Sequence, residues 1–124
     1  MDVVILGASP KPDRYANRAQ RKLLAHGHGV IPVNPAVSEV DGVPTVPLEQ
    51  LSPLPQTITV YLGRERMLPL VPNIADLAPR RVILNPGADD PQVVQALQDK
   101  GVPVQLDCTL ILLDEGRFED LAVS

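Results

Sequence analysis

Residues 3–18, VVILGASPKPDRYANR, decide how this chain is expected to fold. They begin with a short apolar run, Val3 to Leu6, that is rich in β-branched side chains and typical of a strand buried on both faces of a parallel sheet. Gly7 ends this run and opens a turn-rich loop. After the loop, small and apolar residues recur at the three-to-four spacing of an amphipathic helix, at Ala16, Ala19, Leu23 and Leu24. The stretch therefore predicts a buried strand, a loop and a helix.

The same alternation continues to the end of the chain. Further strands are predicted at residues 30–33, 57–62, 82–84 and 102–106. Further helices are predicted at residues 64–77, with a bend at Pro69 and Pro72, and at residues 91–100. Residues 43–46 can form only an edge strand, because Pro44 has no N–H group. Residues 108–113 receive no assignment.

These elements predict one α/β domain over residues 1–124. We expect a Rossmann-like, doubly wound and mostly parallel sheet of about six strands with helices on both faces. In such sheets the crossover from one parallel strand to the next is right-handed in nearly all cases.

Composition excludes several classes of protein. No stretch reaches the roughly 20 consecutive apolar residues of a membrane-spanning helix, and no basic segment typical of a signal peptide precedes Val3. The aromatic fraction of 2% and the net charge of −4 argue against nucleic-acid binding. The single cysteine, Cys108, cannot form an internal disulfide, which fits a reducing compartment. We therefore expect a cytoplasmic domain with no membrane or nucleic-acid partner.

Positive charge is concentrated around the first loop although the chain as a whole is acidic. Residues 1–33 carry five basic and two acidic side chains, whereas residues 89–124 carry two basic and eight acidic ones. The free N–H groups and partial positive charge of a helix N-terminus attract phosphate. Ser9, Lys11 and Arg14 stand just before the first predicted helix. The first loop therefore predicts a site for a polyphosphate ligand.

Ligands of doubly wound sheets bind at the carboxyl ends of the strands, where the strand order reverses. The residues expected at these ends are Gly7, Ala8, Ser9, Lys11, Arg14, Asn17, Asn34, Pro35, Tyr61, Leu62, Gly63, Asn85, Pro86 and Gly87. Singly, these Asn-Pro and Gly-containing segments are also ordinary turn sequences. For Arg18, Arg21 and Lys22, which lie further along the first helix, a solvated helix face is the favoured interpretation.

Two residues disfavour an NAD site. The dinucleotide fingerprint requires a second glycine two positions after Gly7 and an acidic residue at the end of the second strand. The chain has Ser9 and Asn34 at these places. A ligand with additional phosphate remains compatible with the first loop.

Taken together, the motifs resemble a known family, the stand-alone CoA-binding proteins, which are similar to the N-terminal domain of the succinyl-CoA synthetase α subunit. The resemblance covers essentially the whole chain and is most specific at residues 7–18, 33–35, 42–44 and 84–88. It implies that coenzyme A or an acyl-CoA is the ligand. By this resemblance the first loop takes the phosphates, Asn34 and Pro35 border the adenosine, and residues 61–63 and 85–87 flank the pantetheine arm.

The resemblance does not extend to catalysis. The synthetase relies on a phosphorylated histidine in a second domain, and residues 1–124 leave no room for such a domain. His26 and His28 are expected at the far end of the first helix in structural roles. We therefore expect no catalytic residue, no metal site and a function in sensing, carrying or buffering CoA, with an enzyme as a possible partner.

Three alternatives remain open from the sequence. The chain could be an NAD(P)-linked oxidoreductase, an acyl-CoA-transforming enzyme that uses Cys108, or an interaction protein with a vestigial site. Cys108 follows the last predicted strand, so it is expected at the carboxyl edge of the sheet. There it is either a small packing residue or a thiol that forms a reversible disulfide with CoA.

Overall fold

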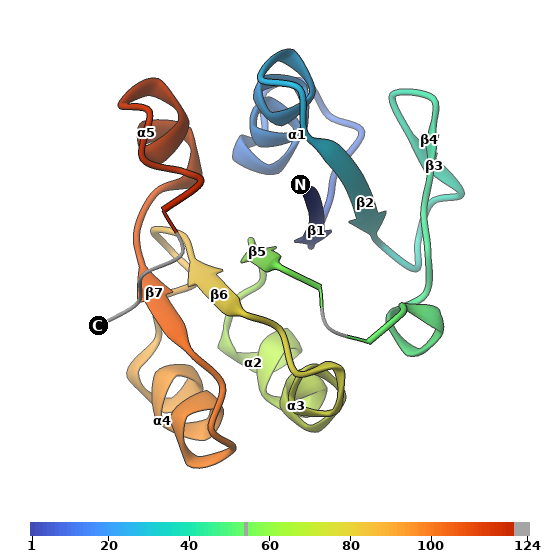
Figure 1. The fold of residues 1–124 in the computed structure, drawn as a ribbon. Helices are drawn as coiled ribbons and strands as arrows, with labels where there is room; N and C mark the ends of the chain where they lie inside the picture. Colours follow the sequence, from blue (N-terminus) through green and yellow to red (C-terminus); the bar gives the residue numbers. More distant parts are fainter. Residues whose placement is uncertain (54, 121–124) are drawn as a thin grey trace.

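A parallel sheet of five strands forms the centre of the structure, a computed structural model that describes residues 1–53 and 55–120 (Figure 1). In spatial order the strands are β2 (Gly29–Val33), β1 (Asp2–Leu6), β5 (Thr57–Val60), β6 (Arg81–Leu84) and β7 (Val104–Leu106). The chain passes from β1 to β2 on one side and continues through β5 on the other, so the strand order reverses between β1 and β5. The predicted Rossmann-like, doubly wound fold is confirmed.

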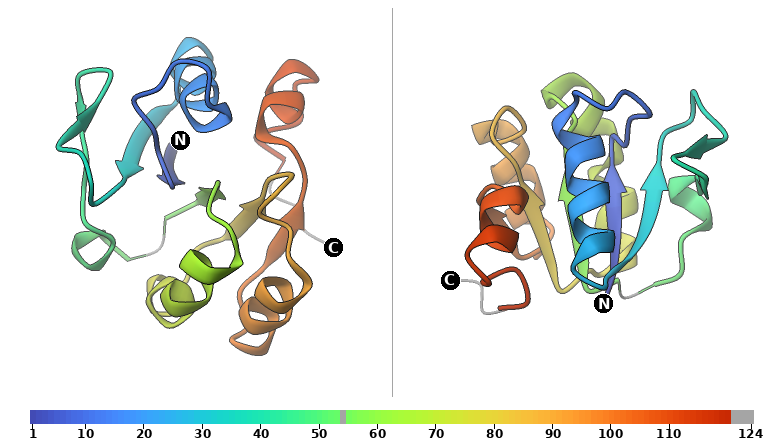
Figure 2. Two further views of the ribbon diagram at one scale, coloured as in Figure 1. Left: turned by 180° about the vertical axis from the view of Figure 1, so that it is seen from behind. Right: turned by 90° about the horizontal axis from the view of Figure 1, so that it is seen from above.

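Helices cover both faces of this sheet, as Figures 1 and 2 show. One face carries α1 (Tyr15–Ala25) and α5 (Thr109–Asp114), and the other carries α2 (Arg64–Met67), α3 (Val71–Leu77) and α4 (Pro91–Asp99). The predicted bend is present, because the 3₁₀ turn η2 (Leu68–Leu70) separates α2 from α3. A second 3₁₀ turn, η1 (Leu48–Gln50), precedes β5. Within the described residues, none of these helices is long and apolar enough to cross a membrane.

The core has two parts, because successive strand residues point to opposite faces of the sheet. Val4 and Leu6 of β1 belong to the cluster under α2, α3 and α4. Val3 and Ile5 belong to the cluster under α1 and α5. All four side chains are at most 1% exposed. This burial on both faces explains why β1 is a continuous apolar run rather than an alternating one.

The strand predicted at residues 43–46 is not part of the main sheet. Val43–Pro44 forms β4, but β4 pairs antiparallel with β3 (Glu39–Val40) in a separate hairpin, so the sheet has five strands rather than about six. Asp41 and Gly42 connect the two strands with φ values of 49° and 81°, as a tight two-residue hairpin turn requires. Because the turn closes a local pairing, the segment does not join the sheet edge as an extra strand.

The amino-terminal edge of the sheet is closed by a buried cation, Arg81 of β6, which is fully buried. Its guanidinium donates hydrogen bonds to Thr57 Oγ1 at 2.9 Å, to Gln105 Oε1 at 3.2 Å and to the carbonyl oxygens of Phe118 and Asp120. It also lies 4.7 Å from the centre of the Phe118 ring. Arg81 thereby attaches the segment after α5 to β5 and β7.

The two histidines lie near this same edge, at the end of α1, as predicted. His26 is the residue that ends α1. His28 is buried, with its ring 5.3 Å from the Phe118 ring and its Nδ1 3.1 Å from the Met1 amine. Burial is the main cause that lowers the pKa of His28, and the Met1 amine acts in the same direction. The histidines therefore lie at the amino edge of the sheet, and the loop after β1 lies at the opposite, carboxyl edge.

Arg81→Ala should lower the free energy of unfolding by about 3 to 4 kcal/mol, because it leaves buried acceptors without a donor. The matched control is Arg80→Ala at the exposed neighbouring position, which should change stability by no more than about 0.5 kcal/mol. Urea denaturation followed by circular dichroism measures both. Equal effects of the two substitutions would show that the buried guanidinium does not hold the C-terminal segment.

Candidate functional site

The loops after β1, β2, β5 and β6 meet at the carboxyl edge of the sheet, where Figure 2 shows them at one end of the strands. Their backbones are joined directly. The amides of Gly7 and Ala8 both donate to the carbonyl oxygen of Val33, at 3.1 and 3.2 Å. The amide of Tyr61 donates to the carbonyl oxygen of Leu6 at 2.9 Å. The edge that the sequence predicted is therefore brought together in the fold.

Gly7 is needed where the loop after β1 passes the end of β5. Its φ is 90°, a left-handed conformation that side chains with a Cβ atom rarely adopt. A Cβ atom at this position would lie 2.9 Å from Leu62 Cδ2 and 3.2 Å from the backbone carbon of Tyr61. The first loop therefore runs directly against residues 61 and 62, which places these predicted site residues beside one another.

The N-terminus of α1 is open to an anion. None of the described side chains caps it, and the first turn of α1 contains no acidic residue. The loop that leads into it carries Lys11 and Arg14, both exposed, and Ser9, whose Oγ accepts a hydrogen bond from the Lys11 amide at 3.2 Å. Free N–H groups at a helix N-terminus with basic side chains beside them bind phosphate well. This is the chemistry that the sequence predicted for the loop.

Asn17 holds the loop instead of extending toward a ligand. It is buried, and its Nδ2 donates to the Ser9 carbonyl oxygen and to Asp41 Oδ2, each at 3.0 Å. Its Oδ1 accepts from Arg21 Nε at 2.9 Å, and Arg21 Nη2 also donates to the Pro12 carbonyl oxygen at 2.8 Å. The sequence interpretation of Arg21 as part of a solvated helix face missed this contact, because sequence spacing alone does not reveal how the loop folds back over the helix.

Asn34 makes a similar internal connection. Its Nδ2 donates to the Ala8 carbonyl oxygen at 2.7 Å, while its Oδ1 accepts from the Ala36 amide at 2.8 Å. Pro35 is exposed beside it. The pair therefore lies next to the first loop, as predicted, but the Asn34 side chain is already bonded to that loop.

Asn85, which directly follows β6, joins β6 to β5 and α5 just below the carboxyl edge of the sheet. It is 2% exposed, and its Nδ2 donates to Thr59 Oγ1 at 2.7 Å and to the Val60 carbonyl oxygen at 2.9 Å. Its Oδ1 accepts from the Thr109 amide at 2.9 Å. Sequence reasoning missed Thr59 and Thr109, although a hydroxyl side chain such as Thr59 within a buried strand is a signal that it has a polar partner.

Two other predicted residues after β6 lie on the surface. Pro86 and Gly87 are exposed, and the Gly87 amide donates to Asp89 Oδ1 at 3.2 Å. The structure therefore separates the three residues of the Asn-Pro-Gly turn, with one side chain buried and the other two residues open to solvent.

Tyr61 has a buried hydroxyl that forms no hydrogen bond within the described residues. Burial is the main cause that raises the pKa of Tyr61 to about 12, although the Thr59 and Thr109 hydroxyls act in the opposite direction. Tyr61 therefore stays protonated at neutral pH, which suits a lining residue or hydrogen-bond donor and not a general base.

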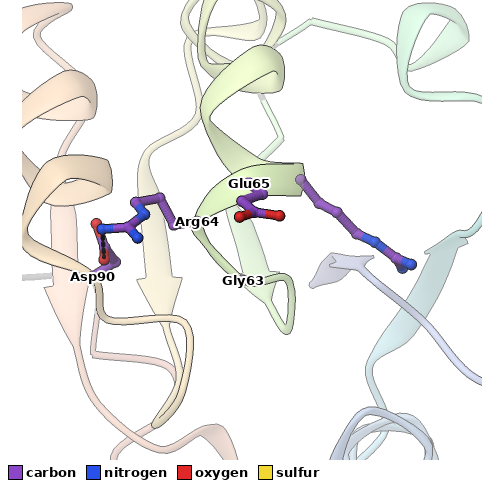
Figure 3. A pocket seen from close by; sticks show the side chains of 5 residues that line it. Gly63, Arg64, Glu65 and Asp90 are labelled. Atoms are coloured by element: carbon purple, nitrogen blue, oxygen red, sulfur yellow. Dashed lines mark ion pairs between the residues drawn. The ribbon is translucent and has the colours of Figure 1, made fainter.

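A shallow pocket of roughly 380 Å³ lies beside the end of β5, lined by Gly63, Arg64, Glu65, Arg66 and Asp90 (Figure 3). Arg64 Nη1 lies 3.5 Å from Asp90 Oδ2, so an ion pair spans from α2 to α4. Asp90 also caps α4 by accepting from the amides of Gln92 and Val93. Sequence analysis did not select Glu65, Arg66 or Asp90, although the charged run that follows Gly63 was a visible signal.

Cys108 lies at the predicted edge, immediately before α5. It is partly buried, and its amide donates to Asp107 Oδ1 at 3.1 Å. Whether it exchanges with a CoA disulfide stays a prediction. Within the described residues, no cluster of three His, Cys, Asp or Glu side chains is arranged to hold a metal ion.

Comparison with known proteins shows the family to which the chain belongs. Residues 2–114 match the CoA binding domain family. This chain belongs to that family of CoA-binding domains. The match contains all four loops that form the carboxyl edge. No match was found among functionally curated proteins.

Solved structures share the fold of this CoA-binding domain. A crystal structure of an uncharacterized protein is 34% identical, with a TM-score of 0.87 over 94% of this chain and 97% of the other. A Thermus thermophilus protein is 29% identical, with a TM-score of 0.82 over 94% of this chain and 90% of that one. A dinucleotide-forming acetyl-coenzyme A synthetase from Ca. Korarchaeum cryptofilum, solved with phosphate and ADP, is 17% identical, with a TM-score of 0.71 over 86% of this chain but 25% of the synthetase. The last likeness shows the shared fold.

Gly7→Ala should destabilise the domain by about 3 kcal/mol, because the positive φ costs roughly 1 to 2 kcal/mol and the contact with the residue 61 backbone adds to it. Gly87→Ala is the matched control, since Gly87 has a φ of 94° but open space around the added Cβ atom. It should cost only about 1 kcal/mol. Urea denaturation of both variants tests the difference, and equal losses would mean that the close approach at Gly7 is unimportant.

Proposed function

We propose that this domain binds coenzyme A or an acyl-CoA without catalysing a reaction, and that the loop after β1 receives the phosphates. The observation that carries the proposal is the uncapped N-terminus of α1, which directly follows the loop with Lys11 and Arg14 in a domain of the CoA-binding family. A diphosphate there would meet free amide groups and two exposed cations, which is favourable for a multiply charged anion.

The rest of the ligand would extend along the carboxyl edge. Asn34 and Pro35 lie beside the first loop, where the family resemblance expects the adenosine. Tyr61 and Leu62 lie on the other side of Gly7, where it expects the pantetheine arm. The arm would continue toward the pocket beside Gly63, because that pocket lies next to the same strand end. The loop after β1 would therefore border the adenosine on its β2 side and the pantetheine arm on its β5 side.

Several contacts support binding without catalysis. The side chains of Asn17, Asn34 and Asn85 are occupied by internal hydrogen bonds. The pKa of Tyr61 is raised, so its hydroxyl is a poor base. His28 lies at the opposite edge of the sheet, against Phe118. The three asparagines therefore build the site and Tyr61 lines it, while His28 lies away from it. This arrangement fits a module that carries or senses CoA, alone or beside an enzyme.

Lys11→Ala and Arg14→Ala should each weaken CoA binding by about 1.5 to 3 kcal/mol, because each removes a charge-assisted contact to phosphate. Lys100→Ala is the control, since Lys100 is an exposed lysine at the end of α4. It should leave the affinity unchanged. Isothermal titration calorimetry gives the three dissociation constants. A Lys11/Arg14 double variant that binds CoA as tightly as the unmodified protein would remove the ligand from this loop.

Coenzyme A should stabilise the domain more than dephospho-CoA, and NAD should stabilise it least. The chain lacks both the second glycine and the acidic residue that an NAD site requires, with Ser9 and Asn34 in their places, whereas a basic side chain can meet the 3′-phosphate of CoA. A thermal-shift series at equal ligand concentrations ranks the three, because a ligand of the native state raises the melting temperature. NAD in first place, with turnover of a nicotinamide cofactor, would support an oxidoreductase instead.

A further inference from the structure

The loop after β1 is held from outside by side-chain donors. Three of its carbonyl oxygens accept such bonds: Ala8 from Asn34, Ser9 from Asn17, and Pro12 from Arg21. Inside the loop, the Arg14 amide donates to the Lys11 carbonyl oxygen at 3.1 Å. A carbonyl oxygen directed into the site would repel an anionic ligand. Donors that bond to these oxygens therefore favour a loop conformation in which the backbone amide groups are left to bind the anion.

The hairpin formed by β3 and β4 also helps to hold the loop after β1. Its tip carries Asp41, whose Oδ2 accepts from the same Asn17 Nδ2 that donates to Ser9. One turn further along α1, Gln20 Nε2 donates to the Val40 carbonyl oxygen at 2.9 Å. Figure 2 shows the hairpin and the loop after β1 at the same end of the sheet. A chain of contacts thus runs from the hairpin tip through Asn17 to the loop.

Both contacts of the hairpin involve buried side chains. Asn17 is 1% exposed and Gln20 is not exposed at all. A buried amide group has few alternative partners, so its bonds define one geometry. The hairpin strands are only two residues long each, and an isolated hairpin of that length is unstable in water. The contacts with α1 therefore fix the position of the hairpin as much as the hairpin fixes Asn17.

We infer that Asp41 and Arg21 are positioning residues for the ligand loop: through Asn17 and Pro12 they hold the loop after β1 in the shape that binds the phosphates. Asp41 orients the Asn17 amide, so that its second N–H group is directed at Ser9. Arg21 holds the other end of the loop, because it donates from Nη2 to the Pro12 carbonyl oxygen and from Nε to Asn17 Oδ1. Neither side chain needs to touch the ligand. The inference rests on the proposed function for the identity of the ligand, but the hydrogen bonds of Asp41 and Arg21 exist in the protein without a ligand.

The conformation at Asp41 allows a clean pair of substitutions. Its φ is 49°, which glycine and asparagine both tolerate well. Asp41→Gly removes the acceptor while keeping the turn, and Asp41→Asn removes the charge while keeping a side-chain oxygen that can accept from Asn17. On α1, Arg21→Ala is matched by Arg18→Ala, because Arg18 is exposed and stacks only on the Tyr15 ring in the described contacts.

Two measurements test the positioning role. By calorimetry, Asp41→Gly and Arg21→Ala should weaken CoA binding by about three- to tenfold, whereas Asp41→Asn and Arg18→Ala should stay within about twofold of the unmodified protein. By hydrogen exchange of the free protein, the amides of Lys11 and Arg14 should exchange faster in the first two variants only, with unchanged exchange in β1.

The outcomes separate this inference from the proposed function. If the unmodified protein does not bind CoA, the proposed function fails, while loop exchange still decides whether Asp41 and Arg21 hold the loop. Unchanged loop exchange in Asp41→Gly and Arg21→Ala would overturn the positioning role. So would an Asp41→Asn variant that binds as weakly as Asp41→Gly, because the charge and not the hydrogen bond would then be responsible.

Discussion

The passage of the loop after β1 across the end of β5 constrains the whole carboxyl edge of the sheet. At Gly7 the two backbones come so close that a single Cβ atom would collide with Leu62 and approach the Tyr61 backbone. This contact lies at the point where the strand order reverses, between β1 and β5. Since the loop then turns directly into α1, its conformation also sets where the free amide groups of that helix point. The shape of this edge therefore depends on that one turn.

Three asparagine side chains hold the loops around this turn together by hydrogen bonds. Asn17, Asn34 and Asn85 each join segments that are distant in sequence: the loop with the hairpin, the loop with the end of β2, and β5 with α5. An amide can donate and accept at once, so one buried side chain satisfies several backbone groups that would otherwise be unpaired. The edge therefore has a defined shape without a ligand, which lowers the ordering cost of binding one.

The two edges of the sheet have different chemistry. The carboxyl edge presents exposed Lys11 and Arg14 beside an open helix N-terminus. The amino edge contains the buried guanidinium of Arg81, bonded to two backbone carbonyl oxygens of the C-terminal segment. The first arrangement exposes its cations to solvent, whereas the second satisfies a cation with internal hydrogen bonds. Positive charge in this acidic chain is thus exposed at one edge, where we propose the phosphates bind, and buried at the other, where it joins the C-terminal segment to the sheet.

By itself, the sequence determined the order of the five main-sheet strands and of the helices between them along the chain, the doubly wound fold and the edge at which the candidate residues gather. Apolar runs such as Val3 to Leu6 and turn residues such as Gly7 are local signals, and parallel strands joined by helices leave few topologies. Only the tertiary structure decided that Val43–Pro44 pairs within a hairpin, that residues 109–114 form a helix, and that Arg21 supports the loop. The same applies to Asn17, Asn34 and Asn85, whose residue type suits both a ligand contact and an internal bond. Which of the two an amide makes depends on which distant backbone groups the fold brings within about 3 Å, and spacing along the chain does not contain that information.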